Sequence, residues 1–380
     1  MSGLLSFRAM REVSRFPGTL LGICLALLGT SLLVLHSASL KPDGTSHPYV
    51  LRQVIWTCAG LAAFGALSHV PYPRIGRRSL RLYMLGLCGL AAVFAVGTTV
   101  NGAKRWISLG PIRVQPSEFM KYVLVIVLAR AIAGAGPRIR TWRGLTEMAA
   151  LTAVPLLMVL TQPDLGTSLT YLPILAAMVF VGGARLRHLA TLAAAGLASL
   201  PVALPLAWAF VLKDYQKLRI LAFLDSSGHS LGGAYQTTQS VIAVGSGGLF
   251  GRGYMQGTQG PLGFLPERHT DFIYAVVCED FGLVGGVLLL GLYGYLIATL
   301  ARIARSCRDL EGRLLVTGVA TILATQVGVN VGMALGVTPV TGLTLPLVSY
   351  GGSSLVAAMA GFGLAASVAR SRVVAFAPEE

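Results

Sequence analysis

Residues 265–299 read LPERHTDFIYAVVCEDFGLVGGVLLLGLYGYLIAT, a short polar motif that leads into a long apolar stretch. The apolar part, residues 271–299, exceeds the roughly 20 residues that an α-helix needs to cross a bilayer. We therefore predict a membrane-spanning helix with the charged motif at one of its ends. Charges beside a bilayer are costly, so a cluster of them there points to a functional site.

Similar apolar stretches recur along the whole chain. Hydrophobic residues make up 54% of the 380 residues and charged residues only 12%, whereas a soluble domain carries roughly 25% charge. This composition predicts an all-α polytopic membrane protein with about ten transmembrane helices. The predicted spans lie near residues 18–40, 50–70, 80–99, 117–134, 147–162, 167–184, 188–212, 271–299, 313–335 and 349–370.

The arginines give the orientation of these spans. Lys and Arg concentrate in cytoplasmic loops, so the arginine-rich connections predict cytoplasmic N and C termini. A long extracytoplasmic loop, residues 213–270, then lies between helices seven and eight of a single membrane domain, 1–380. The arginine clusters fall within residues 8–15, 74–81, 130–143, 185–187, 302–313 and 370–372.

The net charge of +15 is spread over these short connections. The chain has no basic soluble domain, so we expect no nucleic-acid partner, and anionic membrane lipids are the expected partner of the inner arginines. The five cysteines show no metal-ligand spacing, and none falls in a predicted outer loop. Neither a structural disulfide nor a dedicated metal site is expected.

Polar residues gather at the outer ends of the spans, first within residues 101–121. Trp106 beside Arg105 is typical of an interface anchor. A proline and a serine before Glu118 are typical of a helix start with an acid near its positive end. Lys121 follows Glu118 at a spacing of three, so both lie on one face, as either a structural ion pair or a functional one.

The next polar motifs stand at another helix start and in the long loop. Asp164, in the motif QPDLGT, is either a plain helix cap or part of a site. Residues 215–223 predict an amphipathic interfacial helix with Lys217 and Arg219 among its cations. The glycine-rich run 245–253 is either a flexible loop or backbone that approaches a ligand closely.

Asp271 follows His269 at the start of the quoted span. Taken alone, it would complement the helix dipole, but the neighbouring charges favour a functional role. Glu279 and Asp280 lie roughly 12–14 Å deeper, at 1.5 Å per residue, and we expect structural pairing of these acids with another span.

The last outer connection, residues 336–354, is rich in Gly, Pro and Ser and includes Ser349 and Ser353. Irregular backbone at membrane depth is tolerated only where protein or a water-filled cavity surrounds it. We therefore expect this connection to pack inward and line the site.

These motifs together resemble the SEDS family (shape, elongation, division and sporulation), the RodA and FtsW proteins of bacterial wall synthesis. The resemblance runs almost end to end, with the motifs in the same order. Arg268 favours RodA over FtsW, which usually has alanine there, and Asp280 is a mild departure from a usual glutamate. The matching motifs are GAKRW (102–106), QPSEFMK (115–121), QPDLGT (162–167), LPERHTDF (265–272) and residues 339–354.

The resemblance implies a peptidoglycan glycosyltransferase of the bacterial cytoplasmic membrane. Its substrate would be lipid II, a disaccharide-pentapeptide on undecaprenyl diphosphate. Its partner would be a class B penicillin-binding protein that crosslinks the new strand. The Arg268 clue favours a role in elongation and rod shape, and the division-specific role of FtsW stays an alternative.

The resemblance assigns a role to Asp271, and the charges near the outer ends of the spans suggest roles for the other residues. Asp271 matches the essential acid of the family, and we expect it to act as general base. Glu118 and Asp164 are expected to orient cations or to hold a divalent ion such as Mg²⁺ or Mn²⁺, although no closed metal site is readable. The candidates for binding the diphosphate are Arg105, Lys121, Lys217 and Arg219, and the supporting residues are Trp106, Glu118, Asp164, His269, Ser349 and Ser353.

Two other classes of protein fit ten spans with charged outer ends. A lipid II flippase should carry charges along a path to the inner face, whereas the polar motifs here concentrate outside, with Glu279 and Asp280 as the main exception. A scaffold that only recruits the penicillin-binding protein would leave the pattern of acids and cations unexplained. The sequence therefore favours the enzyme over both.

Overall fold

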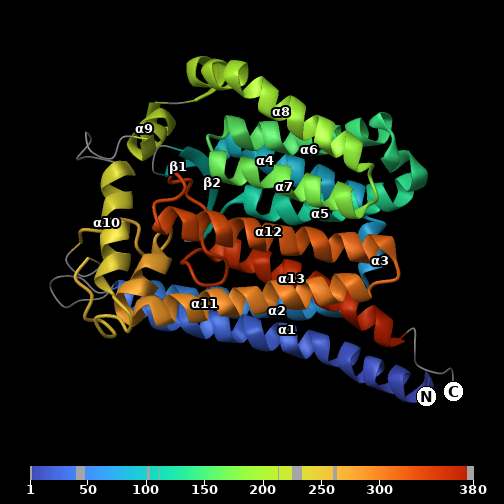
Figure 1. The fold of residues 1–380 in the computed structure, drawn as a ribbon, viewed down its shortest axis with the longest axis horizontal. Coiled ribbons are helices and arrows are strands. Elements are labelled where there is room, and N and C mark those ends of the chain that lie inside the picture. Colours follow the sequence, from blue (N-terminus) through green and yellow to red (C-terminus); the bar gives the residue numbers. More distant parts are fainter. Residues whose placement is uncertain are drawn as a thin grey trace.

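The computed structural model describes residues 2–39, 48–100, 103–110, 112–212, 214–224, 233–259 and 263–374. Most of them form long helices that run back and forth along one axis (Figure 1). The short helix α3 (Tyr72–Gly76) and the 3-10 turn η1 (Gly136–Arg140) lie at the same end of the bundle as the start of the chain. We call this end the inner end and the opposite one the outer end.

In the described part of the chain, ten apolar helices connect the two ends. Within the described ranges, nine helices are long and apolar enough to span a membrane, and α7 is shorter, with 17 residues. The predicted all-α polytopic fold with about ten spans is thereby confirmed. The ten helices are α1 (Ser2–Ser39), α2 (Tyr49–His69), α4 (Ser79–Val96), α5 (Pro116–Ala135), α6 (Trp142–Thr161), α7 (Leu165–Val181), α8 (Leu186–Leu206), α11 (Ile273–Ser306), α12 (Leu310–Ala334) and α13 (Gly352–Val374).

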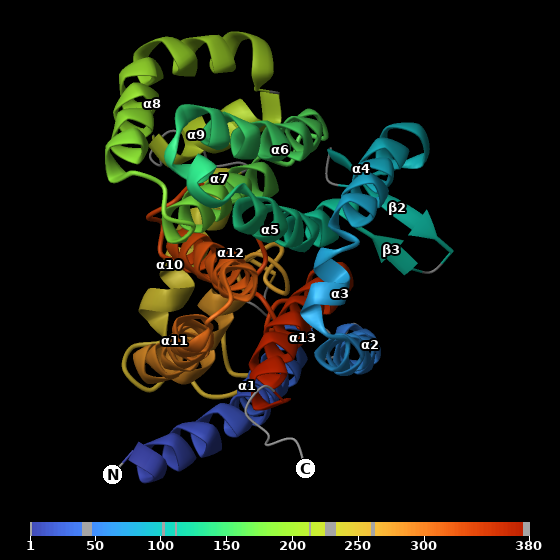
Figure 2. The ribbon, with the colours of Figure 1, turned by 90° about the vertical axis from the view of Figure 1, so that its right-hand side faces the viewer.

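The core lies among α5, α12 and α13. In their apolar windows 61%, 56% and 78% of the residues are buried, against none in α8, which stands at the edge of the bundle (Figure 2). Small residues let membrane helices approach closely. A Cβ atom on Gly363 of α13 would lie 2.7 Å from the Phe64 carbonyl oxygen of α2, so glycine is needed at this crossing.

The outer connection before α5 contains a small antiparallel sheet that the sequence did not predict. The strands β1 (Thr98–Val100), β2 (Ala103–Leu109) and β3 (Ile112–Val114) pair in the order β1-β2-β3. Two of them have only three residues, too few for an alternating pattern to be recognised. The sheet matters for function because β2 carries Arg105 and Trp106 at the outer end of α5.

The long outer loop forms two helices, α9 (Asp214–Leu224) and α10 (Gly233–Ser246), after the π-helical turn η2 (Ala207–Val211) that ends α8. The predicted interfacial helix at residues 215–223 is confirmed as a helix. Residues 213, 225–232 and 260–262 of the predicted loop lie outside the described residues.

Glu279 anchors this loop instead of pairing with another span as expected. Its Oε1 accepts hydrogen bonds from the backbone N–H groups of Thr258 (2.6 Å) and Gln259 (2.9 Å). Asp280 does bond to another span, through Ser37 of α1. The predicted pairing of Glu279 with another span is wrong, because the outer loop folds back against the first turns of α11 and supplies the hydrogen-bond donors instead. Local sequence spacing does not reveal such a contact.

A bend in α11 allows this close contact. Gly282 has φ 68° and ψ −165°, a conformation that strongly favours glycine. Its missing side chain makes room for the loop, because a Cβ atom there would lie 2.4 Å from the backbone nitrogen of Gly251 and from the Leu249 carbonyl oxygen. The loop and α11 therefore fit together only with a glycine at this position.

We expect Gly282→Ala to lower the free energy of unfolding by about 2–3 kcal/mol, through backbone strain and a clash with the loop. Thermal or SDS-induced unfolding of the purified protein measures the change. Gly291→Ala is the control on the same helix, since a Cβ atom there meets no atom within 4 Å. A loss of stability as large in the control would contradict this account.

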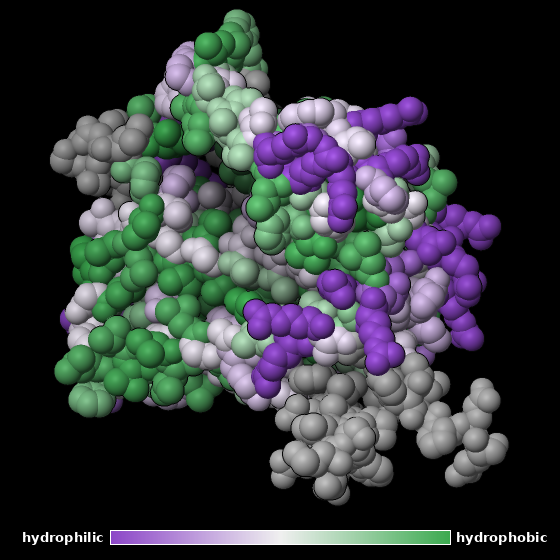
Figure 3. Space-filling model, turned by 45° about the vertical axis from the view of Figure 1, so that its right-hand side comes forward, coloured by the Kyte–Doolittle hydropathy of each residue, from purple (hydrophilic) through white to green (hydrophobic). Residues whose placement is uncertain are grey.

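The surface is polarised along the axis of the bundle. Figure 3 shows hydrophilic side chains gathered at one end and an extensive hydrophobic surface beside them. The purple end is the one that holds the arginine-rich connections, and the apolar helices reach from it to the outer loops (Figure 1). This distribution fits a multi-pass protein of the cytoplasmic membrane with the arginines inside.

Candidate active site

Asp271 lies at the outer end of α11, in the turn that leads into this helix. Its backbone N–H donates to the Glu267 carbonyl oxygen (3.0 Å), and its own carbonyl oxygen accepts from Asn330 Nδ2 (2.9 Å). The same Asn330 nitrogen donates to the Leu343 carbonyl oxygen (2.7 Å). One side chain of α12 thus holds both the start of α11 and the last outer connection.

The carboxylate of Asp271 and an arginine both lie close to Gly342. A Cβ atom on Gly342 would be 3.8 Å from Asp271 Oδ2 and 4.0 Å from Arg219 Nη1. The Arg219 guanidinium also donates to the Val340 carbonyl oxygen (3.3 Å), which holds α9 against the last outer connection. The inward packing of that connection therefore brings a carboxylate and a cation to the same glycine.

The surroundings of Asp271 raise the pKa of its carboxyl to about 6. Burial is the main cause and the Glu267 carboxylate adds to it, whereas Arg219 and Arg105 act in the opposite direction. The side chain nevertheless keeps some solvent exposure. A carboxyl with a pKa near 6 is ionised at neutral pH and more basic than an ordinary aspartate, as a general base requires.

A second set of contacts joins β2, α5 and α7. Asp164 caps α7 by accepting from the Thr167 backbone N–H (3.2 Å), so the cap interpretation is confirmed. The Asp164 carboxylate also accepts from Gln115 Nε2 (2.9 Å) and lies 3.6 Å from Arg105 Nη1. Only 3% of the Asp164 side chain is exposed, against 21% of Arg105. The acid therefore orients a cation that still reaches the surface.

Glu118 and Lys121 form the ion pair that their spacing predicts. Lys121 Nζ donates to both oxygens of the Glu118 carboxylate, at 3.0 Å each. The Lys121 side chain is completely buried, and 8% of the Glu118 side chain is exposed. A contact between Lys121 and a diphosphate would require this pair to open.

The other predicted residues hold the loops of the site in place. The His269 ring stacks on Tyr49 of α2, with 4.3 Å between the ring centroids. Ser349 Oγ donates to the Thr270 carbonyl oxygen (2.6 Å), and Ser353 Oγ accepts from the Gln115 backbone N–H (3.1 Å). Both serines tie the last outer connection and the start of α13 to the rest of the outer end.

Lys217 and Trp106 have less defined roles in the site. Lys217 is partly buried on α9, two residues before Arg219. Trp106 is partly buried on β2, opposite Thr98 of β1. Its place in an outer sheet agrees with the interface-anchor interpretation.

Two residues that the sequence did not single out complete the geometry. Gln115 links Asp164 to Ser353, and Asn330 fixes the Asp271 backbone. Gln115 stands inside one of the quoted motifs, but Asn330 is an isolated polar residue in an apolar helix, and that polarity was the available signal. Among the described residues, no group of three or more His, Cys, Asp or Glu side chains gathers as a metal site would require.

A family model described as cell cycle protein, FtsW/RodA/SpoVE, matches residues 18–373. The chain belongs to this family. The resemblance that the motifs indicated is therefore confirmed, and the matched region includes every candidate residue named above.

Relatives in the FtsW/RodA/SpoVE family are similar to this chain over almost their whole length. The peptidoglycan glycosyltransferase MrdB of Escherichia coli (strain K12) is 41% identical over 356 residues, which is 92% of each chain. A chain of a solved peptidoglycan synthase complex, described as coordinating polymerization and crosslinking, is 38% identical with a TM-score of 0.78, over 93% of this chain and 97% of that one. The crystal structure of the rod shape determining protein RodA of Thermus thermophilus is 36% identical with a TM-score of 0.69, over 93% and 96%.

Proposed function

We propose that this FtsW/RodA/SpoVE protein is a peptidoglycan glycosyltransferase that joins lipid II units into glycan strands at the outer face of the membrane. The observation that carries the proposal is the Asp271 carboxyl, with a pKa of about 6, next to Arg219 at the outer end of the bundle. The names of the relatives support the same activity.

The reaction needs a base, a cation site and a groove for lipid. A sugar hydroxyl of one substrate attacks the anomeric carbon of the other, and Asp271 accepts the hydroxyl proton as the new C–O bond forms. The bond from the anomeric carbon to the diphosphate breaks, and its electron pair leaves with the diphosphate-lipid. No further reactant is required.

The cations of the site would stabilise the leaving diphosphate. Arg105 and Arg219 both act electrostatically on Asp271, so a diphosphate between them would lie near the base. A guanidinium can bind two phosphate oxygens at once, and Lys217 and Lys121 are the further candidates, as point charges. Asp164 keeps Arg105 in position through the 3.6 Å contact.

We also propose a class B penicillin-binding protein as partner and a role in elongation and rod shape. The solved complex that resembles this chain couples polymerization with crosslinking, which supports the partner. The relatives named MrdB and rod shape determining RodA support the role. Arg268, which favoured RodA over FtsW, donates from Nε to the Ala38 carbonyl oxygen (2.7 Å) and so joins the motif to α1.

The test is polymerisation of labelled lipid II by the purified chain together with its crosslinking-blocked partner. Long glycan strands on a gel would support the enzyme. If no strands form while the folded protein moves lipid II across vesicle membranes, the protein is a flippase and the proposal is wrong. Binding of the partner without either activity would indicate a scaffold.

The pH dependence of the rate should reflect Asp271. The base must be ionised, so we expect kcat/KM to fall as the pH drops through about 6. Glu267→Gln removes a negative neighbour and lowers the pKa of Asp271. The acidic limb of the pH profile, where kcat/KM falls as the base is protonated, should therefore move to lower pH. Arg219→Gln removes a positive neighbour and moves the limb to higher pH. Initial polymerisation rates between about pH 5 and pH 8 measure both shifts, and limbs that do not move would contradict the assignment.

A further inference from the structure

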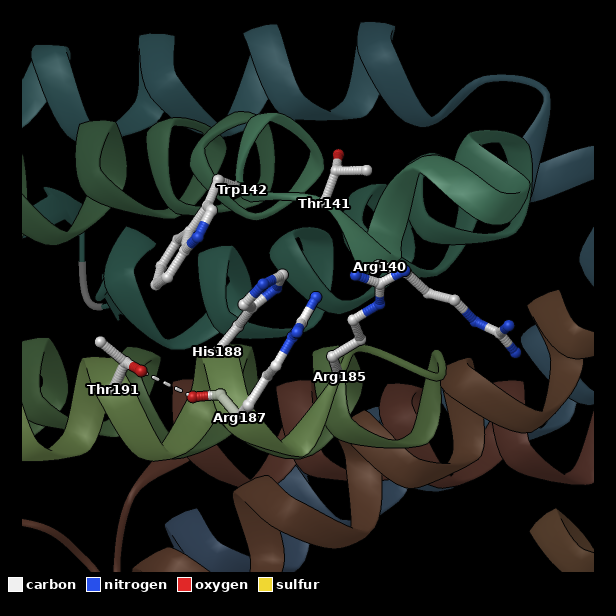
Figure 4. A pocket seen from close by; sticks show the side chains of 7 residues that line it. All are labelled: Arg140, Thr141, Trp142, Arg185, Arg187, His188 and Thr191. Atoms are coloured by element: carbon white, nitrogen blue, oxygen red, sulfur yellow. Dashed lines mark hydrogen bonds between the residues drawn. The ribbon is translucent and has the colours of Figure 1, made fainter.

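A cationic pocket lies at the inner end of the bundle, far along the axis from Asp271. It has a volume of about 480 Å³ and is formed where η1 meets α6 and where α8 begins. Figure 4 shows Arg187 and His188 on α8 and Trp142 on α6, with the side chains directed toward the space between the two helices. The pocket is lined by Arg140, Thr141, Trp142, Arg185, Arg187, His188 and Thr191.

The charges of this pocket favour an anion. Three arginines line it, and all three are exposed. The acid nearest in sequence on α6 is Glu147, which pairs with Arg143 at 3.5 Å and does not line the pocket. Two or three guanidinium groups around one cavity provide the charge-assisted donors that phosphate binds.

Two helix N-termini add backbone donors to the same pocket. Thr141 caps α6 by accepting from the Gly144 N–H, and Arg185 precedes α8 without any side-chain cap. The first N–H groups of a helix have no partner within the helix, and the helix dipole is positive there. Both features favour a phosphate group.

His188 gives an independent indication that a ligand belongs in the pocket. It is buried, with only 7% of its surface exposed, and its Nδ1 has no hydrogen-bond partner among the described residues. Its ring packs on Trp142, with 4.5 Å between the centroids. Buried polar atoms are normally satisfied, so the lack of a partner for Nδ1 among the described residues favours a ligand at this ring.

The surroundings of α8 identify this partner as a lipid. Leu192 and Leu197 of α8 are 50% and 67% exposed, and none of the residues in the apolar window of this helix is buried. Acyl chains can therefore lie along α8 directly below the pocket, while Trp142, 45% exposed, sits at the level expected for an interfacial aromatic. A soluble phosphate would use the arginines but not this apolar flank.

We infer that the pocket binds the phosphate of an anionic phospholipid from the inner leaflet and thereby links the inner ends of α6 and α8. Basic pockets between membrane helices on the cytoplasmic side bind such head groups. Arg140, Arg185 and Arg187 bind the phosphate, His188 donates or accepts one hydrogen bond, and the acyl chains cover α8. The inference is independent of the proposed polymerase activity.

Native mass spectrometry of the full-length protein, released from nanodiscs that contain phosphatidylglycerol and phosphatidylcholine, tests the inference. We expect wild type to retain phosphatidylglycerol preferentially. Arg185→Gln combined with Arg187→Gln should lower this retention about 25-fold, at about fivefold for each arginine. His188→Phe keeps the ring but removes the nitrogens, and it should lower retention about fivefold.

Arg74→Gln combined with Arg77→Gln is the matched control, because it removes two exposed arginines of the inner end that do not line the pocket. If this control retains phosphatidylglycerol within about twofold of wild type, the result supports a specific site. A change of up to about twofold is expected from the loss of long-range charge alone. If the control and the pocket variant lose equal amounts of phosphatidylglycerol, the arginines attract anionic lipid only through their overall charge, and the inference is wrong. Arg185→Lys combined with Arg187→Lys keeps the charges and should restore most retention, which guards against misfolding as the cause.

Inorganic phosphate distinguishes the two sources of a phosphate group. If phosphate in the buffer displaces the phospholipid from the pocket and stabilises the lipid-depleted protein as strongly, the natural ligand is soluble and the lipid assignment is wrong. We expect instead that phosphatidylglycerol raises the unfolding temperature of wild type and that phosphate alone does not. The pocket variant should show neither response.

Discussion

Asp271→Asn should reduce the rate of glycan polymerisation by about three orders of magnitude, within the range that general-base catalysis contributes. The asparagine amide has nearly the same shape, but it cannot accept a proton from the acceptor hydroxyl. The backbone contacts that hold residue 271, to Glu267 and Asn330, do not use the side chain and should persist. The substitution therefore tests the chemistry with little change in the fold.

The measurement is the initial rate with labelled lipid II in the presence of the penicillin-binding partner. Glu147→Gln is the control, because it neutralises one acid at the inner end, in a pair with Arg143 that is largely exposed. We expect the control to work at the wild-type rate. Strands made by Asp271→Asn at a rate within tenfold of wild type would remove Asp271 as the base and leave the cation cluster to be explained otherwise.

The position of the spans could be predicted because it depends on local composition. Each predicted stretch overlaps a helix, and even α7, with 17 residues, was found between the motif at Asp164 and the arginine at position 185. The short strands β1 and β3 were missed because their pairing partners, rather than their own residues, define them. The same reason explains why Glu279 was expected to meet a span and instead binds the loop at Thr258.

The residues of the candidate site could be predicted from the sequence, but the contacts between residues far apart in the chain could not. Local spacing gave the Glu118–Lys121 pair and the cap at Asp164, which involve neighbours in sequence. The contact of Asn330 with Asp271 joins residues 59 positions apart, and no sequence pattern fixes such a pairing. The balance that raises the pKa of Asp271 likewise depends on burial by distant segments.

The second large effect concerns stability. Lys121→Met should lower the free energy of unfolding by about 3–5 kcal/mol, the usual result of removing one partner of a buried ion pair. Lys121 donates to both oxygens of Glu118, and neither side chain has ready access to water. The variant leaves a carboxylate in the bundle without its cation.

Adding Glu118→Gln to Lys121→Met should restore most of the lost stability, since the lone carboxylate is then gone. Reversible SDS-induced unfolding in mixed micelles measures both changes. Arg143→Met is the control for an ion pair at the surface and should cost less than about 1 kcal/mol, because the Arg143 side chain is 86% exposed. A double variant as unstable as Lys121→Met alone would mean that packing of the lysine, rather than its charge, holds the start of α5.

The double variant also separates structure from substrate binding at Lys121. If the pair only stabilises α5, the refolded double variant should polymerise lipid II at close to the wild-type rate. If Lys121 leaves Glu118 to bind the diphosphate during the reaction, the double variant should be stable and slow, with a loss in kcat/KM of about tenfold or more, as expected for one charge-assisted contact. The static pair cannot serve both roles at once, because the Lys121 side chain is completely buried against Glu118 and cannot reach a diphosphate outside the bundle. A functional Lys121 therefore requires a movement at the outer end of α5, next to Gln115 and Asp164, when the substrate enters.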